Sequence, residues 1–241
     1  MNPPPPLLNS PAPLSPAPSR LWPGLALALF VVSMLIAIPI ELASSPVAID
    51  RIVRDADSST WVTFSKVRMW VSFTGQLVFA GGVLLCAGFV RGGWGIRRLS
   101  LLAVAFGIGA SLLALIVVNL MHNPAQSRLP QSFDIWDWIW LAQVSLQTGA
   151  VVALALALRG WIRWAGLAIG VVVFVFLFGD WAIFMARKFG MIEFSAWNRW
   201  GSWTLGFAGV LGAHLAVVLC TAMVLFKPAL ASDGPRLPRA T

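Results

Sequence analysis

The sequence contains no tyrosine, only two cysteines and two histidines, and few charged residues, which make up 11% of its 241 positions. A soluble globular domain usually carries about 25% charged residues, so the composition excludes that class. Hydrophobic residues account for 59% of the chain, and the mean hydropathy is +0.82. Cys86 and Cys220 lie inside apolar runs without the spacing of redox or zinc motifs, which indicates buried, inert thiols. These features together indicate an integral membrane protein.

Acidic residues are also scarce, with nine against seventeen Lys and Arg, which gives a net charge of +8. Such an excess can mark a nucleic-acid-binding protein, but here the basic residues are scattered in small groups between apolar runs. That arrangement is typical of residues that set the topology of membrane helices, so we predict no nucleic-acid partner. The lipid bilayer is the expected partner, with other membrane-protein subunits and anionic lipid headgroups as further candidates.

Six apolar runs are each long enough to cross about 30 Å of hydrocarbon at about 1.5 Å per residue. They cover residues 21–43, 67–90, 99–121, 134–158, 162–186 and 201–226. We therefore predict an all-α integral membrane domain over residues 21–227, built as a bundle of six transmembrane helices. The first run is too long for the core of a signal peptide, although cleavage after Ala43 is an alternative.

Outside the six runs, the sequence predicts two tails and one surface helix. Residues 1–20 contain eight of the sixteen prolines, and this composition predicts a disordered tail. Residues 228–241 are predicted to form a short flexible tail. The segment between the first two runs has room for a helix that lies on the membrane surface. The apolar residues that recur there at roughly helical spacing are Val47, Ile49, Ile52 and Val53.

The loops predict that both termini face the cytoplasm. The number of basic residues alone hardly distinguishes the two orientations, because nine lie on the predicted cytoplasmic side and eight on the other. Acidic residues are distributed unequally between the two sides of the membrane. Only Asp233 falls on the predicted cytoplasmic side, and the other eight lie outside or in the outer half of a run. The short basic loops RGGWGIRR and RGWIR contain no acidic residue. A bacterial inner membrane is the expected location.

The stretch 119–140, NLMHNPAQSRLPQSFDIWDWIW, concentrates polar residues in an otherwise apolar chain. It contains Asn119, His122, Arg128 and Asp137, and it ends in three of the nine tryptophans that lie toward the predicted outer side, out of thirteen in all. One interpretation is a solvated loop before a helix, with Asp137 near the positive end of the helix dipole and the tryptophans as interfacial anchors. The other is one wall of an outward-facing pocket.

Polar residues at one shared depth favour the pocket. The residues that fall in the outer half of five runs are Thr74, Gln76, Asn119, Asp137, Gln143, Gln147, Asp180 and Thr204. At about 100° per residue, Gln143 and Gln147 lie about 40° apart, so this polar face is expected to point into the bundle. The residues of the candidate binding pocket are Asn119, His122, Arg128, Asp137, Gln143, Gln147, Asp180, Arg187 and Lys188.

Asp180 is the most informative single residue, because it lies among apolar neighbours in VFVFLFGDWAIFMA. A carboxylate at that depth is costly unless it is paired, neutral or in contact with water. As a structural ion pair or interfacial carboxylate, it would take Arg187, Lys188 or Arg68 as its partner. Alternatively, Asp180 handles a substrate or a proton.

The two histidines and the glycines predict structural roles. His122 and His214 differ in depth by about 15–20 Å, so they cannot ligate one haem or one metal ion, and we predict no cofactor and no metal site. His214 is expected to hydrogen-bond a neighbouring helix. Small residues at four-residue spacing, such as Gly166 with Gly170 and Gly209 with Ala213, indicate close helix contacts.

The layout of runs and loops carries one resemblance. Arg128 with Pro130 follows the third run in NLMHNPAQSRLP, and Arg187 with Lys188 follows the fifth in MARKFGMIEFSAW. This arrangement over residues 21–227 resembles the type 2 phosphatidic acid phosphatase superfamily, which hydrolyses lipid phosphates at the outer leaflet. The Pro-Ser-Gly-His of that family is absent from QSFDIWDW, and no His follows the fifth run at the family's spacing. The resemblance implies a catalytically silent relative whose basic residues hold a phosphate.

The sequence assigns no specific function and leaves three hypotheses. The leading one is a non-enzymatic protein, either an accessory or assembly subunit of a membrane complex or a small binding or transport module with an outward-facing polar pocket. The alternative is a catalytically degenerate protein similar to lipid-phosphate phosphatases. The third, a proton-coupled transporter, rests on Asp180 alone.

The predicted topology can be tested by labelling single cysteines after Cys86 and Cys220 are replaced by Ala. A membrane-impermeant maleimide added to intact cells is expected to label Ser127→Cys, since the loop that contains this residue is predicted to face outward. Gly93→Cys in the loop RGGWGIRR should react only after the membrane is permeabilised. The reverse pattern of labelling would place both termini outside.

Overall fold

The computed structural model describes residues 21–55, 58–89, 96–121, 135–193 and 195–226. The elements in these residues are helices: α1 Leu21–Ala43, α2 Pro46–Asp55, α3 Ser58–Phe89, α4 Ile96–Met121, α5 Ile135–Leu156, α6 Trp161–Lys188 and α7 Ala196–Phe226. All of them except α2 are long and apolar enough to cross a bilayer. The prediction of a multi-pass membrane protein with six spans is confirmed. The two tails predicted over residues 1–20 and 228–241 lie outside the described residues.

The segment between the first two spans forms more helix than predicted. Its apolar residues belong to α2, and α3 begins at Ser58, well before the predicted start of the second span at Val67. The apolar part of α3 covers only Thr63–Gly88. A pattern of hydropathy ends where polar side chains begin, whereas the backbone hydrogen bonds of a helix continue past that point.

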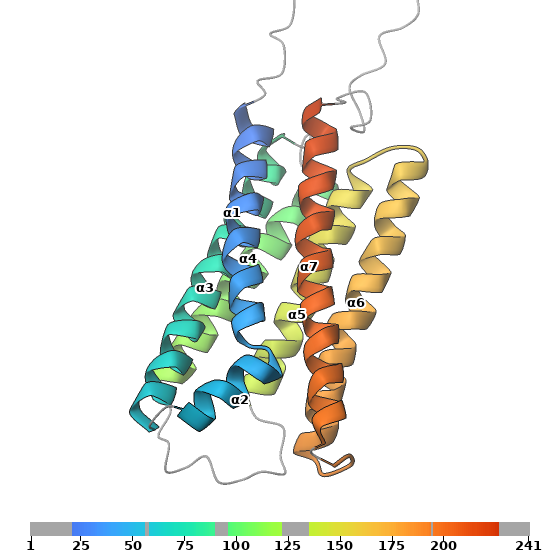
Figure 1. Ribbon diagram of the computed structural model, residues 1–241. Helices are drawn as coiled ribbons and strands as arrows, with labels where there is room; N and C mark the ends of the chain where they lie inside the picture. Colours follow the sequence, from blue (N-terminus) through green and yellow to red (C-terminus); the bar gives the residue numbers. More distant parts are fainter. Residues whose placement is uncertain (1–20, 56–57, 90–95, 122–134, 194, 227–241) are drawn as a thin grey trace, which may run out of the picture.

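The six long helices stand side by side, and α2 lies across one end of the bundle (Figure 1). Each long helix packs against the next one along the chain, and α7 also packs against α1, so the six helices form a closed ring. Helix α5 contacts α7 across this ring. The first residue of α1 and the last residue of α7 lie at the opposite end from α2. The end of the bundle that carries α2 is called the α2 end below.

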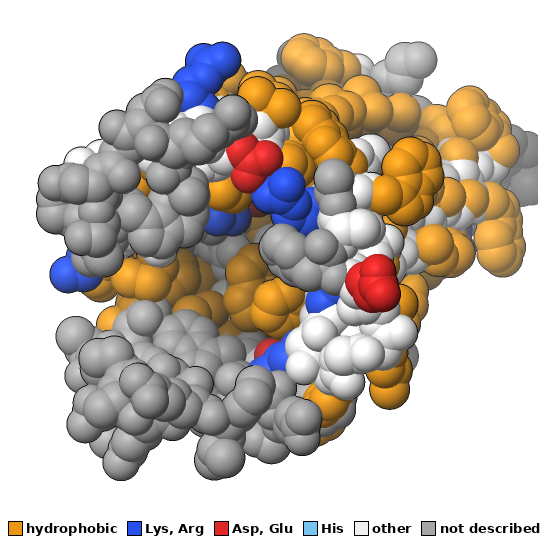
Figure 2. Space-filling view, turned by 60° about the horizontal axis from the view of Figure 1, so that its bottom comes forward, with side chains coloured by type: hydrophobic (Ala, Val, Ile, Leu, Met, Phe, Trp, Pro, Cys, Tyr) orange, Lys and Arg blue, Asp and Glu red, His pale blue; other side chains and the backbone are white. Residues whose placement is uncertain are grey.

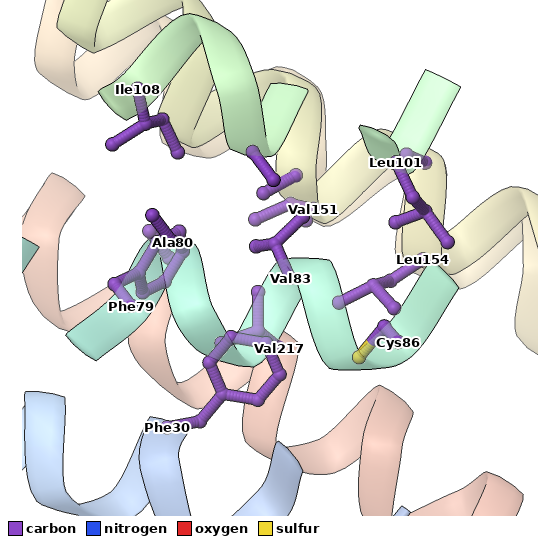
Figure 3. Close-up of a cluster of buried hydrophobic side chains, with 14 of the residues drawn as sticks. Phe30, Phe79, Ala80, Val83, Cys86, Leu101, Ile108, Val151, Leu154 and Val217 are labelled. Carbon is purple, nitrogen blue, oxygen red and sulfur yellow. The ribbon is translucent and has the colours of Figure 1, made fainter. Parts of the chain in front are cut away.

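An apolar core fills the ring between the helices (Figure 3). The Phe30 ring lies against the backbone of Gly82, where an added Cβ atom would come within 2.6 Å of it. Phe30 meets Phe79 edge to face, with the ring centroids 5.4 Å apart. The outer surface of the ring is also apolar, as is expected for helices that contact lipid, and on α6 it includes Val171, Val172 and Val175.

Glycines allow neighbouring helices to approach closely at the positions that the sequence spacing indicated. A Cβ atom at Gly166 of α6 would lie 2.7 Å from Cβ of Ala155 on α5. A Cβ atom at Gly209 of α7 would lie 2.6 Å from Cδ2 of Leu177 and 3.1 Å from its backbone nitrogen on α6. These distances are too short for any side chain larger than hydrogen, so the packing of α5, α6 and α7 depends on these glycines.

Gly209→Ala is expected to destabilise the protein by about 1–3 kcal/mol, the usual cost of overpacking, because the backbone of Leu177 has to move. Thermal unfolding in detergent, followed by tryptophan fluorescence, measures this loss. The matched control is Gly109→Ala on α4, where an added Cβ atom meets nothing within 4 Å. If both substitutions lower the unfolding temperature equally, the close approach at Gly209 is not the cause.

Candidate functional site

Polar side chains gather in the middle of the bundle and at the α2 end. Figure 2 shows this end hollowed, with Lys, Arg, Asp and Glu side chains around the hollow. Toward the α2 end, the buried polar side chains include Ser44, in the turn after α1, together with Asp137, Gln143 and Ser202. Those near the middle include Ser33, Thr148 and His214. Most of the buried polar groups therefore lie between the middle of the bundle and its α2 end, while Thr221 lies toward the other end of α7 beside Cys86.

A cavity of about 40 Å³ lies among α1, α3, α5 and α7. Its polar lining consists of Ser33, Glu41, Ser72, Gln76, Gln147 and His214, and the remaining lining residues are apolar or glycine. Because one water molecule needs roughly 10–15 Å³ of such space, the cavity has room for two or three. This is the place in the described residues where amide, hydroxyl, carboxylate and imidazole groups face a common space.

His214 is 5% exposed and connects three helices by hydrogen bonds. Its Nδ1 atom lies 2.8 Å from the carbonyl oxygen of Val210, and since a carbonyl only accepts, Nδ1 donates. Its Nε2 atom lies 3.0 Å from Oγ of Ser33 on α1. That hydroxyl also donates to the carbonyl oxygen of Gly75 on α3, at 2.9 Å. His214 thus hydrogen-bonds a neighbouring helix, as the sequence predicted.

The amides of α3 and α5 are incompletely satisfied. Gln143 is 4% exposed, and its Oε1 accepts a long hydrogen bond of 3.4 Å from Nε2 of Gln76. The other two amide atoms, Gln76 Oε1 and Gln143 Nε2, are buried and have no hydrogen-bond partner among the described residues. Buried polar atoms in proteins are normally paired with protein, water or a ligand. Gln147 lies about one turn further along α5 and lines the cavity.

Asp180 of α6 is held against α7. The hydroxyl of Ser202 donates to its Oδ1 atom. Gly206 leaves room for the carboxylate, because an added Cβ atom there would lie 2.8 Å from Oδ2 of Asp180. Among the cations predicted to pair with Asp180, Arg187 lies within electrostatic range. Ser202 was not predicted, because the sequence does not show which face of α7 meets Asp180.

Asp137 and Lys188, two residues of the predicted pocket, form an ion pair. Nζ of Lys188 lies 2.5 Å from Oδ2 of Asp137, and these side chains are only 16% and 4% exposed. Helix α6 ends at Lys188, and Gly190 then adopts a left-handed conformation with φ 70° that turns the chain. The pair therefore fastens the end of α6 to the start of α5, and Lys188 is engaged by Asp137 rather than by Asp180.

Helix α2 and the end of α1 are fastened to α7. Arg199 forms a forked interaction with Asp50 of α2, with distances of 2.7 Å from Nη1 to Oδ1 and 3.3 Å from Nη2 to Oδ2. The indole Nε1 of Trp203 donates to the carbonyl oxygen of Glu41, at 2.9 Å. These contacts fix the corner between α1 and α2 beside the cavity.

Three polar cavity residues, Ser33, Ser72 and Glu41, were not predicted from the sequence, and Glu41 is the charged one. Its carboxylate lies within electrostatic range of both Arg68 and Asp180. Glu41 is the only charged residue in the apolar run 21–43, and that isolation is the signal that could have identified it.

The predicted pocket residues thus fall into separate groups. Gln143 and Gln147 belong to the cavity region, Asp137 and Lys188 to the ion pair, and Asp180 with Arg187 to the contact between α6 and α7. The remaining three lie beyond what the structure describes: His122, Arg128 and the side chain of Asn119.

Comparison with known proteins gives no match to a family model, a curated protein or a solved structure. The interpretation of the cavity therefore rests on its own geometry and chemistry.

Lys188→Met is expected to destabilise the protein by about 3–5 kcal/mol, because it leaves the Asp137 carboxylate buried without its cation. The double variant Asp137→Asn with Lys188→Met removes both charges and should recover most of that loss. Chemical or thermal unfolding of the two single variants and the double variant gives the coupling between the residues. Additive effects of the two substitutions would show that the pair does not interact in solution.

Proposed function

We propose that the protein is a small binding or transport module of a bacterial inner membrane, with both termini in the cytoplasm and the α2 end outward. Its ligand is a small polar solute or cation that occupies the cavity among α1, α3, α5 and α7. The observation that carries this proposal is the cavity itself, which Glu41 and Gln147 line beside two buried amide atoms without partners.

The chemistry of the lining favours a small ligand that is positively charged or rich in hydrogen-bond donors. Glu41 supplies a carboxylate, while Ser72, Gln76 and Gln147 supply hydroxyl or amide oxygens. Rings of oxygen atoms replace the hydration shell of cations in membrane proteins. A volume of about 40 Å³ is far below the roughly 300–1,000 Å³ of pockets for drug-sized molecules, so the ligand is an ion or a solute of a few atoms.

The location of these groups also supports a functional role. Carboxylates and amides within membrane spans are costly, and those that persist commonly mark pathways for substrates, ions or protons. Asp137 and Asp180 each have a direct partner that accounts for their burial. Glu41 and the glutamines instead face the cavity or retain unpaired atoms, which is the arrangement expected of a site that takes a ligand.

The hypothesis of a protein similar to lipid-phosphate phosphatases stays a prediction. A phosphate held by Arg187 and Lys188 would have to displace the Asp137 carboxylate, which already accepts a hydrogen bond from Lys188. Hydrolysis of a lipid phosphate by the purified protein, lost in Arg187→Ala, would favour that hypothesis. A native pull-down in mild detergent separates a solitary module from an accessory subunit, because a subunit brings its partners at fixed stoichiometry.

The ligand can be sought by thermal unfolding of the purified full-length protein at constant ionic strength with sodium, potassium, ammonium or choline. A ligand at about 100 times its dissociation constant stabilises the folded state by about 2.7 kcal/mol. One of the three small cations is expected to raise the unfolding temperature saturably, while choline, which exceeds the cavity, should not.

The matched variant for this experiment is Gln147→Leu, which removes a lining amide at similar volume and should abolish the saturable rise. Ser145→Ala is its control, because Ser145 is exposed on the same helix and donates to the carbonyl oxygen of Leu141. The proposal fails if no small cation stabilises the protein, or if Gln147→Leu responds as the parent does.

A further inference from the structure

We infer that the corner between α1 and α2 is a gate to the cavity, and that it swings about Pro39 to admit the ligand from the α2 end. The gate consists of residues 40–55, which form the last turn of α1, the connecting turn and α2. The inference rests on the proposed function for the identity of the ligand. Its own basis is a hinge in α1, a rigid corner beyond the hinge, and two contacts with α7 that keep the corner closed.

The hinge is Pro39, which lies inside α1, four residues before the helix ends at Ala43. Proline has no N–H, so the carbonyl oxygen of Leu35 receives no helical hydrogen bond from position 39, and the proline ring crowds that carbonyl. Prolines are a usual cause of sharp kinks in helices. Because α1 lacks one of its hydrogen bonds here, it bends more easily at Pro39 than elsewhere along its length.

The part of α1 before the proline is fixed to the bundle. Oγ of Ser33 lies 2.9 Å from the carbonyl oxygen of Gly75 on α3 and 3.0 Å from Nε2 of His214 on α7. The Phe30 side chain is fully buried and lies against the backbone of Gly82. These contacts anchor this part of α1 to two neighbouring helices, so a bend at the proline moves the part that follows it.

The corner beyond the proline is bound together by its own hydrogen bonds. The backbone nitrogen and Oγ of Ser44 both donate to the carbonyl oxygen of Ile40, at 3.0 Å and 2.6 Å. Oγ of Ser45 accepts a hydrogen bond from the backbone nitrogen of Ala48, at 3.4 Å, and so caps the start of α2. The last turn of α1 and α2 are therefore expected to move as one body.

Two side chains at the start of α7 hold this corner against the bundle. Nε1 of Trp203 donates to the carbonyl oxygen of Glu41, at 2.9 Å, and Arg199 forms its forked interaction with Asp50. Because Arg199 and Trp203 are four residues apart, they project from the same face of α7. The side chains of Arg199 and Asp50 are 31% and 38% exposed, and ion pairs in contact with water contribute little to stability. The corner is thus held by contacts that open at small cost.

The hinge lies in the wall of the cavity. Helix α1 lines the cavity on both sides of the proline, with Ser33, Ile36 and Ala37 before it and Ile40 and Glu41 after it. A swing of the corner away from α7 removes the last two from the wall and opens the cavity toward the α2 end, which is hollowed (Figure 2). The Glu41 carboxylate moves with the corner, so the cation site is complete only when the gate is closed.

The position of α2 allows this movement. Helix α2 lies across the end of the bundle, outside the ring formed by the six long helices (Figure 1). A swing of residues 40–55 therefore leaves the packing of that ring in place. Hinged closure of this kind, in which a few residues absorb the change in backbone angles, is a common way to enclose a ligand.

The test measures access to the cavity in the full-length protein in lipid nanodiscs, with Cys86 and Cys220 replaced by Ala. Ser72→Cys is the reporter, because Ser72 lines the cavity from α3, which is not part of the gate. The reagent is a small cationic methanethiosulfonate, which exceeds the cavity of about 40 Å³ and reacts only when the gate opens. Mass spectrometry gives the rate of modification, which is expected to be slow in the parent.

Trp203→Phe keeps an aromatic ring but removes the N–H that holds Glu41. It is expected to raise the rate of modification about two- to tenfold, the factor that corresponds to one net hydrogen bond. Adding Arg199→Met should raise the rate further. Trp200→Phe is the matched control, because Trp200 is 41% exposed on the same helix and its ring meets Trp203 edge to face. An unchanged rate in the variant that carries both Trp203→Phe and Arg199→Met would overturn the gate.

Pro39→Ala restores an N–H that can donate to the carbonyl oxygen of Leu35, so α1 should stiffen and the rate of modification should fall about twofold or more. Pro23→Ala is the matched control, since Pro23 lies in the first turn of α1, where an N–H has no helical acceptor. Equal effects of the two substitutions would overturn the assignment of Pro39 as the hinge.

Asp50→Lys keeps the inference testable if Trp203→Phe does not fold. It changes a partly exposed side chain and places a like charge opposite Arg199, so it should push the corner away from α7 and raise the rate. A rate equal to that of the parent would count against the gate.

The outcome is separate from that of the proposed function. Saturable stabilisation by a small cation, with a rate of modification that ignores every substitution in the corner, would retain the module and remove the gate. Faster modification in Trp203→Phe and Asp50→Lys, without stabilisation by any small cation, would retain the gate and remove the proposed ligand.

Discussion

The Ser33 hydroxyl joins three helices, and the arrangement of the polar interior depends on it. It lies within hydrogen-bond distance of the Gly75 carbonyl of α3 and of His214 on α7. Gly75 also lets α1 approach, because an added Cβ atom there would lie 3.1 Å from Cγ2 of Ile36. Within a bilayer no bulk water can replace these bonds, so α1, α3 and α7 must stay together for the groups to remain satisfied. The cavity opens beside this junction.

The polar side chains divide into those that bind one helix to another and those that face the cavity. The contacts Asp137 with Lys188, Asp50 with Arg199 and Ser202 with Asp180 pair each donor with an acceptor and hold the helix ends at the α2 end. The partner accounts for the burial of Asp137 and for the placement of Asp180 between α6 and α7, whereas Asp50 and Arg199 pair near the surface. The carboxylate of Glu41 lines the cavity, and the amides of Gln76 and Gln143 at or beside it each keep one buried atom without a partner among the described residues.

This division changes the weight of the hypotheses that the sequence left open. Asp180 fits a structural role, since a hydroxyl and the backbone at Gly206 enclose it. The charged residue that lines the cavity is Glu41, which shares that lining with His214. A binding or transport module accommodates this arrangement, because carboxylate, amide and hydroxyl groups line the same small cavity.

The six spans and the inward direction of Gln143 were set by the sequence alone, because hydropathy and helical periodicity depend only on residues close together in the chain. The depth of each polar side chain in the membrane could also be inferred, since it follows from the residue's position along its span. The order of helices around the ring and the rotation of each one arose only in the tertiary structure. That rotation decided that Ser202 meets Asp180, that Lys188 meets Asp137, and that Glu41 faces the cavity. The physical reason is that apolar helix surfaces all contact lipid equally well, so close packing and polar pairing between distant segments choose the neighbours.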